Sequence, residues 1–303
     1  MKAMVSVNKT PIEGKKTDKI AYLFLAPSII FLIVFICWPL FQTAIFSFTD
    51  WDGLAPMNFL GFDNYIEFFR SPVAHRSFMN NMRWVVVVCS VPLIIGITQA
   101  SVLVNSGIKG ATVFQLLLFL PQILSSVVVT VIWGWIYNPA IGPLNTALRS
   151  VGLDILTRTW LGDPNLVIWA LLVMHVWMLY GFNTVIYAAA IRGIDTNLYD
   201  AAAIDGCGMF RKFFFVTVPS VRRITTTLLL FAMIDSFRVI DIIIQMTNGG
   251  PGFASHVMSF YLYNQSFIRF RIGYGSAIAV VFTIMLIIFS NGLLRLRERG
   301  DRK

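Results

Sequence analysis

Three charged side chains lie inside one of the most apolar stretches of the chain, "FAMIDSFRVIDIIIQM", and are the first candidates for chemistry. Asp235, Arg238 and Asp241 follow one another at intervals of three residues. If the stretch is one continuous helix, all three fall within an arc of about 120°. Charges in hydrocarbon are costly, so they should face protein, where they either pair with one another or line a path for a hydroxyl-rich solute. The spacing therefore predicts an intramembrane charge cluster.

A second apolar stretch, residues 166–192, carries aromatic and amide side chains of the kind that recognise saccharides. They are Trp177, Tyr180, Phe182, Asn183 and Tyr187. Aromatic faces pack on the C–H surfaces of a sugar, and a few planar polar groups fix its orientation. The same side chains could instead form an aromatic packing face between helices, because aromatic residues also dominate cores. The residues alone leave both interpretations open.

Sequence signatures of catalysis are missing. No G-x-x-x-x-G-K-[ST] occurs, so the chain does not cradle ATP phosphates by that route. No nucleophile elbow or zinc motif occurs either. The histidines His75, His175 and His256 are far apart without metal-type neighbours, and a satisfied or solvent-facing role is expected for each. We therefore predict that this chain is not an enzyme by itself and holds neither a cofactor nor a metal.

The segment 193–220 is charged and helix-forming although it separates two apolar stretches. In "GIDTNLYDAAAIDGCG", Asp195 or Thr196 can cap the start of a helix. Gly206 and Gly208 can end it. Its small apolar side consists of Leu198, Ala201, Ala202 and Ile204. Such a surface suits insertion into a groove of another protein, while a merely solvated connecting helix is the alternative.

The composition places these features in a membrane protein. Of the 303 residues, 57% are hydrophobic and 13% are charged, whereas soluble domains carry about 25% charged residues. Six apolar blocks are long enough to cross about 30 Å of hydrocarbon. The predicted spans are 20–48, 80–104, 111–137, 166–192, 221–246 and 273–294. Because the blocks lack the alternation of a membrane barrel, we predict an all-α, polytopic protein with six transmembrane helices.

The distribution of Lys and Arg sets the predicted orientation. With the N-terminus in the cytoplasm, 16 of the 24 Lys and Arg residues belong to inside segments and 7 to outside segments, and Arg238 lies within a span. Positive residues concentrate on the cytoplasmic side, so both termini are predicted to be cytoplasmic. The predicted domains are a tail 1–19, a transmembrane domain 20–294 with a cytoplasmic loop 193–220, and a tail 295–303. This topology accounts for the net charge of +9, which therefore does not indicate nucleic-acid binding.

The cytoplasmic loop resembles the EAA loop of permease subunits of binding-protein-dependent ABC importers. The family pattern is Glu-Ala-Ala, three residues, Gly, nine residues and Ile-x-Leu-Pro. The matching positions are Asp200, Ala201, Ala202, Gly206, Val216, Val218 and Pro219. Asp replaces Glu, and Val replaces both Ile and Leu. The shorter side chain of Asp200 would alter any cap or ion pair that the usual Glu makes.

Further segments resemble the sugar-permease branch of that family. "APSIIFLIVFICWPLFQTAIFSFTD" is similar to its first span and "GFDNYIEFF" to its usual outside segment. "NPAIGPLNTALRSVGL" is similar to the loop before the fourth span, and "TNGGP" to the segment after the fifth. The resemblance is closest to subunits of maltose-like, lactose-like and glycerol-phosphate uptake systems. It implies the type I importer permease fold in a bacterial inner (plasma) membrane.

The resemblance also implies a coupling role and a set of partners. The helix 196–206 would be the coupling helix, seated in a cytoplasmic ATPase and transmitting the closure of that ATPase to the spans. The implied coupling residues are Leu198, Asp200, Ala201, Ala202, Asp205, Gly206 and Pro219. The implied partners are a second homologous permease subunit, two ATPase subunits that bind ATP and Mg, and an extracytoplasmic solute-binding protein.

In the family the solute site is built from the fourth and fifth spans near mid-membrane. The substrate path implied here consists of Tyr180, Phe182, Asn183, Asp235, Ser236 and Val239. The solute is expected to be a sugar or sugar-like molecule. Because two Asp residues flank Arg238, a neutral sugar is favoured over a phosphorylated one. The alternative is an ion-coupled secondary transporter that uses Asp235 and Asp241, although the inverted repeats typical of that class are not recognisable.

Overall fold

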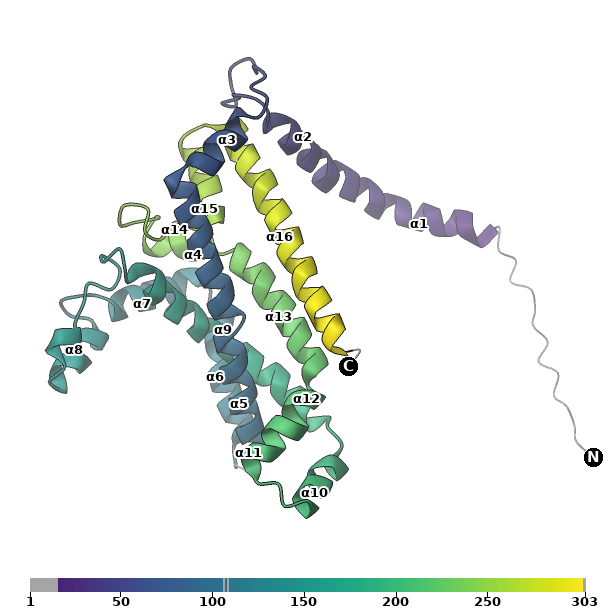
Figure 1. Ribbon diagram of the computed structural model, residues 1–303, viewed down its shortest axis with the longest axis vertical. Helices are drawn as coiled ribbons and strands as arrows, with labels where there is room; N and C mark the ends of the chain where they lie inside the picture. Colours follow the sequence, from purple (N-terminus) through teal and green to yellow (C-terminus); the bar gives the residue numbers. More distant parts are fainter. Residues whose placement is uncertain (1–15, 106, 108, 302–303) are drawn as a thin grey trace, which may run out of the picture.

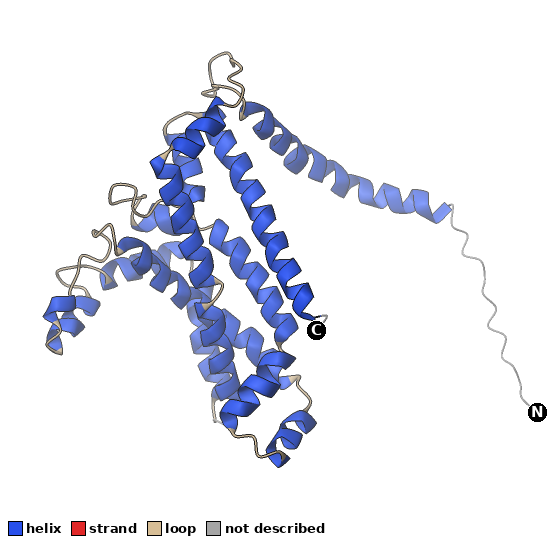
Figure 2. Cartoon of the chain, in the orientation of Figure 1, coloured by secondary structure: helices blue, strands red, loops and turns tan. Residues whose placement is uncertain are grey.

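The computed structural model describes residues 16–105, 107 and 109–301, so most of the predicted tail 1–19 and the last two residues of the tail 295–303 lie outside the described residues. Within the described part the chain is almost entirely helical (Figure 2). The strand pairing found there is an isolated bridge between Thr49 and Phe59. The prediction of an all-α protein is confirmed.

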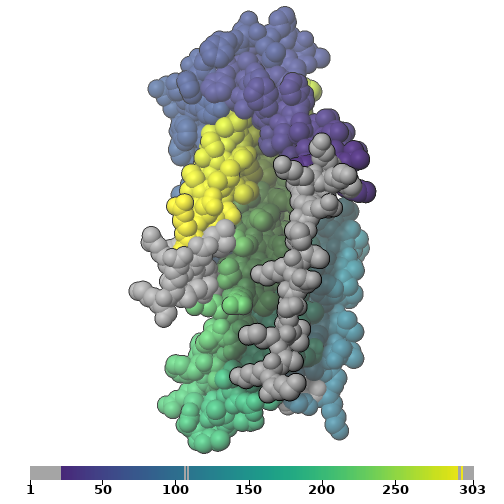
Figure 3. Space-filling model, turned by 90° about the vertical axis from the view of Figure 1, so that its right-hand side faces the viewer, coloured from purple at the N-terminus to yellow at the C-terminus, as the bar shows by residue number. Residues whose placement is uncertain are grey.

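The first span stands apart from the rest of the molecule. It runs through α1 (Lys16–Leu32), a π-helical stretch η1 (Ile33–Cys37) and α2 (Trp38–Phe46), in agreement with the predicted 20–48. Figure 1 shows it leaving the bundle at one end and extending away from it. None of its most apolar window is buried. In the space-filling view its purple surface meets the yellow α16 only near that end (Figure 3).

The C-terminal end of this span is anchored by polar groups and by a close backbone approach. The side-chain amide of Asn64 donates hydrogen bonds to the carbonyl oxygens of Ser47 and Thr49, at 3.0 and 2.8 Å. Gly273, near the start of α16 (Ile272–Asp301), donates its N–H to the carbonyl oxygen of Trp51 at 2.8 Å. A β-carbon on Gly273 would overlap the Thr49 carbonyl, so the position requires glycine.

The second span is one 34-residue unit, Pro72–Asn105, made of α4 (Pro72–Val88) and α5 (Val91–Asn105). It begins earlier than the predicted 80–104 because Ser71 caps α4 by accepting the N–H of Ala74. Proline at the first helical position suits this start, since its missing N–H is not needed there. The short α3 (Asp63–Arg70) precedes it at the end of the molecule where the first span joins.

The third span is broken, which corrects the prediction of one helix over 111–137. Helix α6 (Ala111–Ile123) and α7 (Ser126–Ile136) meet at an angle of 97°. Leu124 is extended, and the side chain of Ser125 caps α7 by accepting the N–H of Val128. In a continuing helix, carbonyl groups of the preceding turn would accept these backbone N–H groups. The side chain of a capping serine accepts one of them instead, so a new helix can begin in a new direction. Helices α8 (Pro143–Ser150) and η2 (Asp154–Leu156) follow.

The fourth span, α9 (Val167–Arg192), is the centre of the bundle and agrees with the predicted 166–192. It packs closely against α5 and α6 through two glycines. A β-carbon on Gly96 of α5 would lie 2.7 Å from the β-carbon of Asn183. A β-carbon on Gly181 of α9 would overlap the carbonyl of Leu118 in α6. Small residues let membrane helices approach in this way, so the glycines set the depth at which α9 sits.

The predicted fifth span, 221–246, is also corrected. The chain enters it through α10 (Thr196–Ile204), α11 (Met209–Lys212), the π-helical η3 (Phe213–Thr217) and α12 (Val218–Ser220), which bends by 70° into α13 (Arg222–Phe237). Helix α13 ends at Phe237, and a separate helix, α14 (Asp241–Met246), follows. Then come α15 (Met258–Tyr263), η4 (Asn264–Ile268) and α16, whose apolar part, Ile272–Gly292, agrees with the predicted 273–294.

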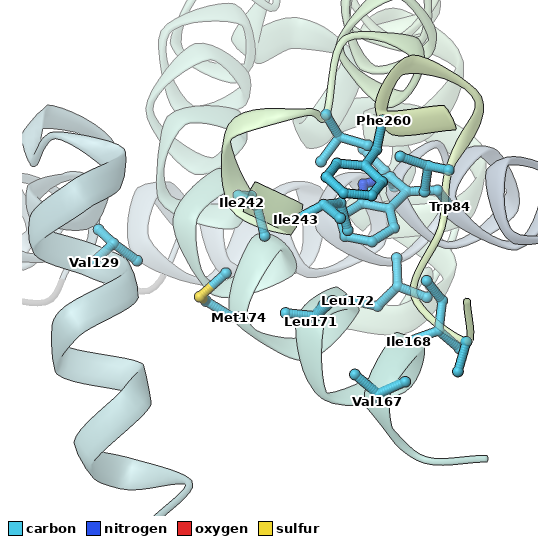
Figure 4. Packing of buried hydrophobic residues seen from close by; sticks show 14 residues of the cluster. Trp84, Val129, Val167, Ile168, Leu171, Leu172, Met174, Ile242, Ile243 and Phe260 are labelled. Carbon is cyan, nitrogen blue, oxygen red and sulfur yellow. The ribbon is translucent and has the colours of Figure 1, made fainter. Parts of the chain in front are cut away.

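In the described chain, four helices are long and apolar enough to span a membrane, or six if each bent pair counts as one span. Figure 1 places α10 and α11 at one end of the bundle and the loop before α3 at the other. The main core joins α4, α9, α14 and α15 through Trp84, Leu171, Ile243 and Phe260, all essentially inaccessible to solvent (Figure 4). This core lies directly beside the residues that line the cavity described next.

Candidate functional site

A cavity of about 350 Å³ lies between α4, α6, α9 and α13. Its polar lining comes from Gln122, Asn183, Asp235 and Arg238, and the remaining wall is apolar, with Phe182 and Phe231 among its members. Ligand sites in proteins are typically apolar hollows of 300–1,000 Å³ with a few convergent polar groups. The cavity therefore has the size and chemistry of a site for a small polar molecule.

The structure brings together half of the predicted substrate path. Phe182, Asn183 and Asp235 line the cavity. Tyr180 is half-buried on α9 and is not part of the lining. Ser236 is buried and its hydroxyl donates to the carbonyl oxygen of Ala232 at 2.6 Å. Val239 is buried in the main core. The role of these residues in transport stays a prediction.

The geometry predicted for the intramembrane charge cluster is wrong. Asp235 lies on α13, Arg238 lies in the turn that follows, and Asp241 begins α14, so the three do not share one helix face. Among the described residues, no ion pair joins them. At this helix end a side chain from α4 takes up a carbonyl that α13 leaves free: Asn81 donates to the carbonyl oxygen of Ser236 at 3.0 Å.

The partner of Asp235 is a histidine that sequence reasoning set aside. His175 Nε2 on α9 lies 3.1 Å from Asp235 Oδ2, at ion-pair distance but outside hydrogen-bond alignment. On its other side, His175 Nδ1 accepts a hydrogen bond of 2.9 Å from the indole N–H of Trp84. The signal in the sequence was a histidine inside an apolar span, which by default marks a polar partner within the bundle.

The loop at the opposite end of α9 forms the short helix that its residues predict. The Asp195 carboxylate accepts the N–H of Asn197 at 3.0 Å and so caps α10. At the other end, Gly206 takes a φ of +72°. The N–H groups of Gly206 and Cys207 bond the carbonyls of Ala203 and Ala202, at 3.0 and 2.8 Å. This pattern is the glycine-terminated helix end expected from the sequence.

Helix α10 presents its residues to solvent and is attached to the bundle by one face. No residue of α10 is buried, and Ile204 is 87% exposed. The Tyr199 hydroxyl lies 2.9 Å from the hydroxyl of Thr217, a buried residue of η3. A hollow of about 590 Å³ separates α10 and α11 from the end of α5, and both Asp200 and Lys212 line it.

The predicted coupling residues are accordingly accessible. The residues exposed on or beside α10 are Leu198, Asp200, Ala201, Asp205 and Gly206. Pro219 lies at the start of the next span, and Ala202 is half-buried. Helix α10 therefore offers a rigid, solvent-exposed surface, and its role in coupling stays a prediction.

At the other end of the bundle, a charged pair connects α3 to the start of α16. Arg271 donates two hydrogen bonds to the Glu67 carboxylate, at 2.7 and 2.5 Å, and lies over the ring of Tyr274. The Glu67 carboxylate raises the pKa of Arg271. Burial, and secondarily the charge of Arg269, lowers the pKa of His256 to about 4, so this imidazole is neutral at pH 7.

Comparison with known proteins assigns the family. The model of the family "Binding-protein-dependent transport system inner membrane component" matches residues 92–302, more than half of the chain. The chain belongs to this family. The ion-coupled alternative finds no support in the comparisons. The membership makes the chain a multi-pass membrane component of a transport system that works with a binding protein.

Relatives match along most of their length. The probable ABC transporter permease protein YurN of Bacillus subtilis is 34% identical over 94% of this chain and 98% of its own. The diacetylchitobiose uptake system permease protein NgcF of Streptomyces coelicolor is 32% identical over 88% of this chain and 79% of its own. A bacterial ABC transporter involved in the import of the polysaccharide alginate has the same fold, with a TM-score of 0.81 at 22% identity over 94% and 96% of the chains.

Proposed function

We propose that this chain is a permease subunit of an ATP-driven importer that translocates a sugar or sugar-like solute. The observation that carries the proposal is the cavity between α9 and α13, where the amide of Asn183 and the carboxylate of Asp235 share a wall with Phe182. Amide and carboxylate groups bond hydroxyls, and aromatic faces cover the apolar side of a sugar ring. The relatives support a saccharide: their names specify diacetylchitobiose, sulfoquinovosyl glycerol, and trehalose or maltose.

The lining favours a neutral solute over a strongly acidic one. Among the described lining residues, the charged groups are Asp235 and Arg238, one of each sign. An anionic solute such as a sulfonate would need a cationic group to compensate for the loss of its hydration, and the carboxylate of Asp235 offsets the charge of Arg238 among these lining residues. Trehalose, maltose and diacetylchitobiose are therefore better first candidates than sulfoquinovosyl glycerol.

In this proposal, partner subunits supply the energy for transport. Two cytoplasmic ATPases would bind ATP and Mg, and each permease would receive their closing motion through a helix such as α10. The exposed, doubly capped α10 supports this role, because a short helix with satisfied ends can act as a stiff lever. ATP binding would then shift the permease pair between inward-open and outward-open arrangements.

A second homologous permease and the lipid bilayer would cover the surfaces that the isolated chain leaves apolar. The first span has none of its apolar window buried in this chain. One side of such a helix can face lipid and the other a partner subunit. The proposed orientation has both termini and α10 in the cytoplasm of a bacterial cell, as the Lys and Arg distribution favours.

The test is transport in proteoliposomes that contain this chain with its second permease, its ATPase and its binding protein. Uptake of trehalose, maltose, diacetylchitobiose and sulfoquinovosyl glycerol is measured with ATP inside and without ion gradients. We expect ATP-dependent uptake of at least one neutral saccharide, and its loss when residues 198–208 are deleted, because the ATPase then no longer co-purifies. Uptake driven by an ion gradient without ATP would refute the proposal.

A further inference from the structure

Three buried side chains from three different helices form a chain of contacts that ends at the cavity wall. Trp84 of α4 contacts His175 of α9, which contacts Asp235 of α13. Neither Trp84 nor His175 lines the cavity, whereas Asp235 does. We propose that His175, held by Trp84, is a positioning residue that fixes the Asp235 carboxylate as an acceptor for solute hydroxyl groups. The inference rests on the proposed function, since it takes the cavity as the solute path.

The donors and acceptors of the three side chains determine which ring nitrogen of His175 carries the proton. An indole N–H can only donate, so the Nδ1 atom of His175 that receives it at 2.9 Å carries no proton. A neutral imidazole then carries its proton on Nε2. That N–H lies on the side of Asp235, whose Oδ2 atom is 3.1 Å away. Trp84 therefore selects the tautomer that presents a donor to the carboxylate.

Burial leaves His175 no other partners and so enforces this tautomer. Trp84 is fully buried and His175 is 5% exposed. Water cannot replace either partner at such a site, and an unpaired buried polar group costs about 1–3 kcal/mol. The Asp235 side chain is 47% exposed although its Oδ2 atom is buried. One carboxylate oxygen is thus directed into the protein toward His175, which leaves the other for a donor in the cavity.

The backbone beside Asp235 is held by the same helix. Asn81 lies three residues before Trp84 on α4, so the two side chains lie on the same face, one turn apart. Asn81 donates to the carbonyl oxygen of Ser236 at 3.0 Å and accepts the N–H of Met258 at 2.8 Å. Helix α4 therefore fixes Asp235 twice, through its carboxylate by way of His175 and through the next residue of its backbone. A carboxylate held in one position discriminates between saccharides, because it accepts a hydrogen bond best from a hydroxyl group at the matching position.

The first experiment reads the tautomer directly in the complex reconstituted in nanodiscs. The chain contains three histidines, so ¹⁵N-histidine labelling gives three imidazole patterns, and His175→Gln assigns one of them. We expect His175 to carry its proton on Nε2 in a single tautomer, and Asp235→Asn to shift its Nε2 resonance. In Trp84→Phe the tautomers should mix. A proton on Nδ1, or no response to Asp235→Asn, would overturn the inference.

The second experiment separates positioning from a purely structural role. The measured quantity is the number of saccharide molecules taken up per ATP hydrolysed, with the panel member that the wild-type complex transports. We expect His175→Leu to lower this ratio about tenfold, the scale of leaving a buried polar group without its neighbour, because it removes the 3.1 Å contact that orients the carboxylate, while ATP hydrolysis stimulated by the loaded binding protein persists. His175→Gln retains a donor at the Nε2 position and should stay within about threefold of wild type.

Matched controls come from residues of the same types outside the network. His75 is exposed on α4, and Trp133 on α7 is half-buried with its ring packed against Trp177. His75→Gln and Trp133→Phe should leave both the transport ratio and the His175 tautomer unchanged. Equal losses in His175→Gln and His175→Leu would refute positioning. If the wild-type complex transports no saccharide of the panel, the sugar proposal fails, and the ¹⁵N measurement still decides whether His175 is held as described.

Discussion

Replacing Gly181 by alanine tests how the depth of α9 in the bundle sets the cavity. The added β-carbon would overlap the carbonyl of Leu118 and lie 3.0 Å from the backbone nitrogen of Phe119. Carbon atoms need a separation of about 3.5 Å, so α6 and α9 would have to part by more than about 1 Å. The obstacle is backbone and cannot be relieved by a rotamer change. Overpacking of this kind costs on the order of 3 kcal/mol.

The functional consequence follows from the neighbours of Gly181 in the chain. Phe182 and Asn183 line the cavity and would move with α9. We expect Gly181→Ala to lower the thermal stability of the purified complex and to reduce saccharide uptake at least tenfold. Gly96→Ala should have a smaller effect, because its β-carbon would overlap less: it would lie 2.7 Å from the β-carbon of Asn183 and 3.0 Å from the backbone carbonyl carbon of that residue.

The matched control for this substitution lies in another apolar helix. A β-carbon on Gly134 of α7 meets no atom within 4 Å, so Gly134→Ala should be neutral or slightly stabilising. Stability is measured by heating the complex and following its loss from size-exclusion chromatography, and uptake is measured in proteoliposomes. If Gly181→Ala behaves like Gly134→Ala in both measurements, the argument that the α6–α9 contact positions the cavity wall is refuted.

Three further predictions concern other parts of the molecule. Asn81→Ala leaves two buried backbone groups without partners and should destabilise the complex by about 2–4 kcal/mol, seen as a lower melting temperature; an unchanged melting temperature would contradict the assignment. Tyr199→Phe removes the hydroxyl contact with Thr217 and should weaken the attachment of α10 by about 1 kcal/mol, which lowers uptake per ATP without unfolding the spans; unaltered coupling would count against α10 as a lever. His256 has a pKa of about 4 against an ordinary 6.5, so the unfolded chain binds its proton first as the pH falls. Stability should therefore decrease between pH 6.5 and 4, by at most about 3 kcal/mol, and His256→Asn should flatten that part of the pH profile of thermal stability; a profile identical to wild type would exclude His256 as its source.

Features that depend on local chemistry could be read from the sequence. The central span was predicted within a residue of its ends because 26 consecutive residues, Val167–Arg192, form a single uninterrupted helix. The start and end of α10 were predicted from Asp195 and Gly206, whose preferences act on backbone groups a few residues away. Both signals require no knowledge of the rest of the fold.

The breaks in the third and fifth spans could not be read in the same way. Pro121 lies inside α6, yet the chain turns at Leu124 and Ser125, where the cap of α7 begins. Nothing in the local sequence ends α13 at Phe237, since no glycine or proline stands there. The helix ends where Asn81, 155 residues away, takes up the carbonyl of Ser236.

The order of residues along the chain by itself determined the class of protein: an all-α membrane component with a capped, exposed helix between two spans. Those properties follow from hydropathy summed over about 20 residues and from hydrogen bonds within one helical turn. Only the tertiary structure decided which side chains form the cavity and which partner holds Asp235. Trp84, His175 and Asp235 come from three helices, and contacts across such distances depend on how closely glycines such as Gly181 let those helices pack.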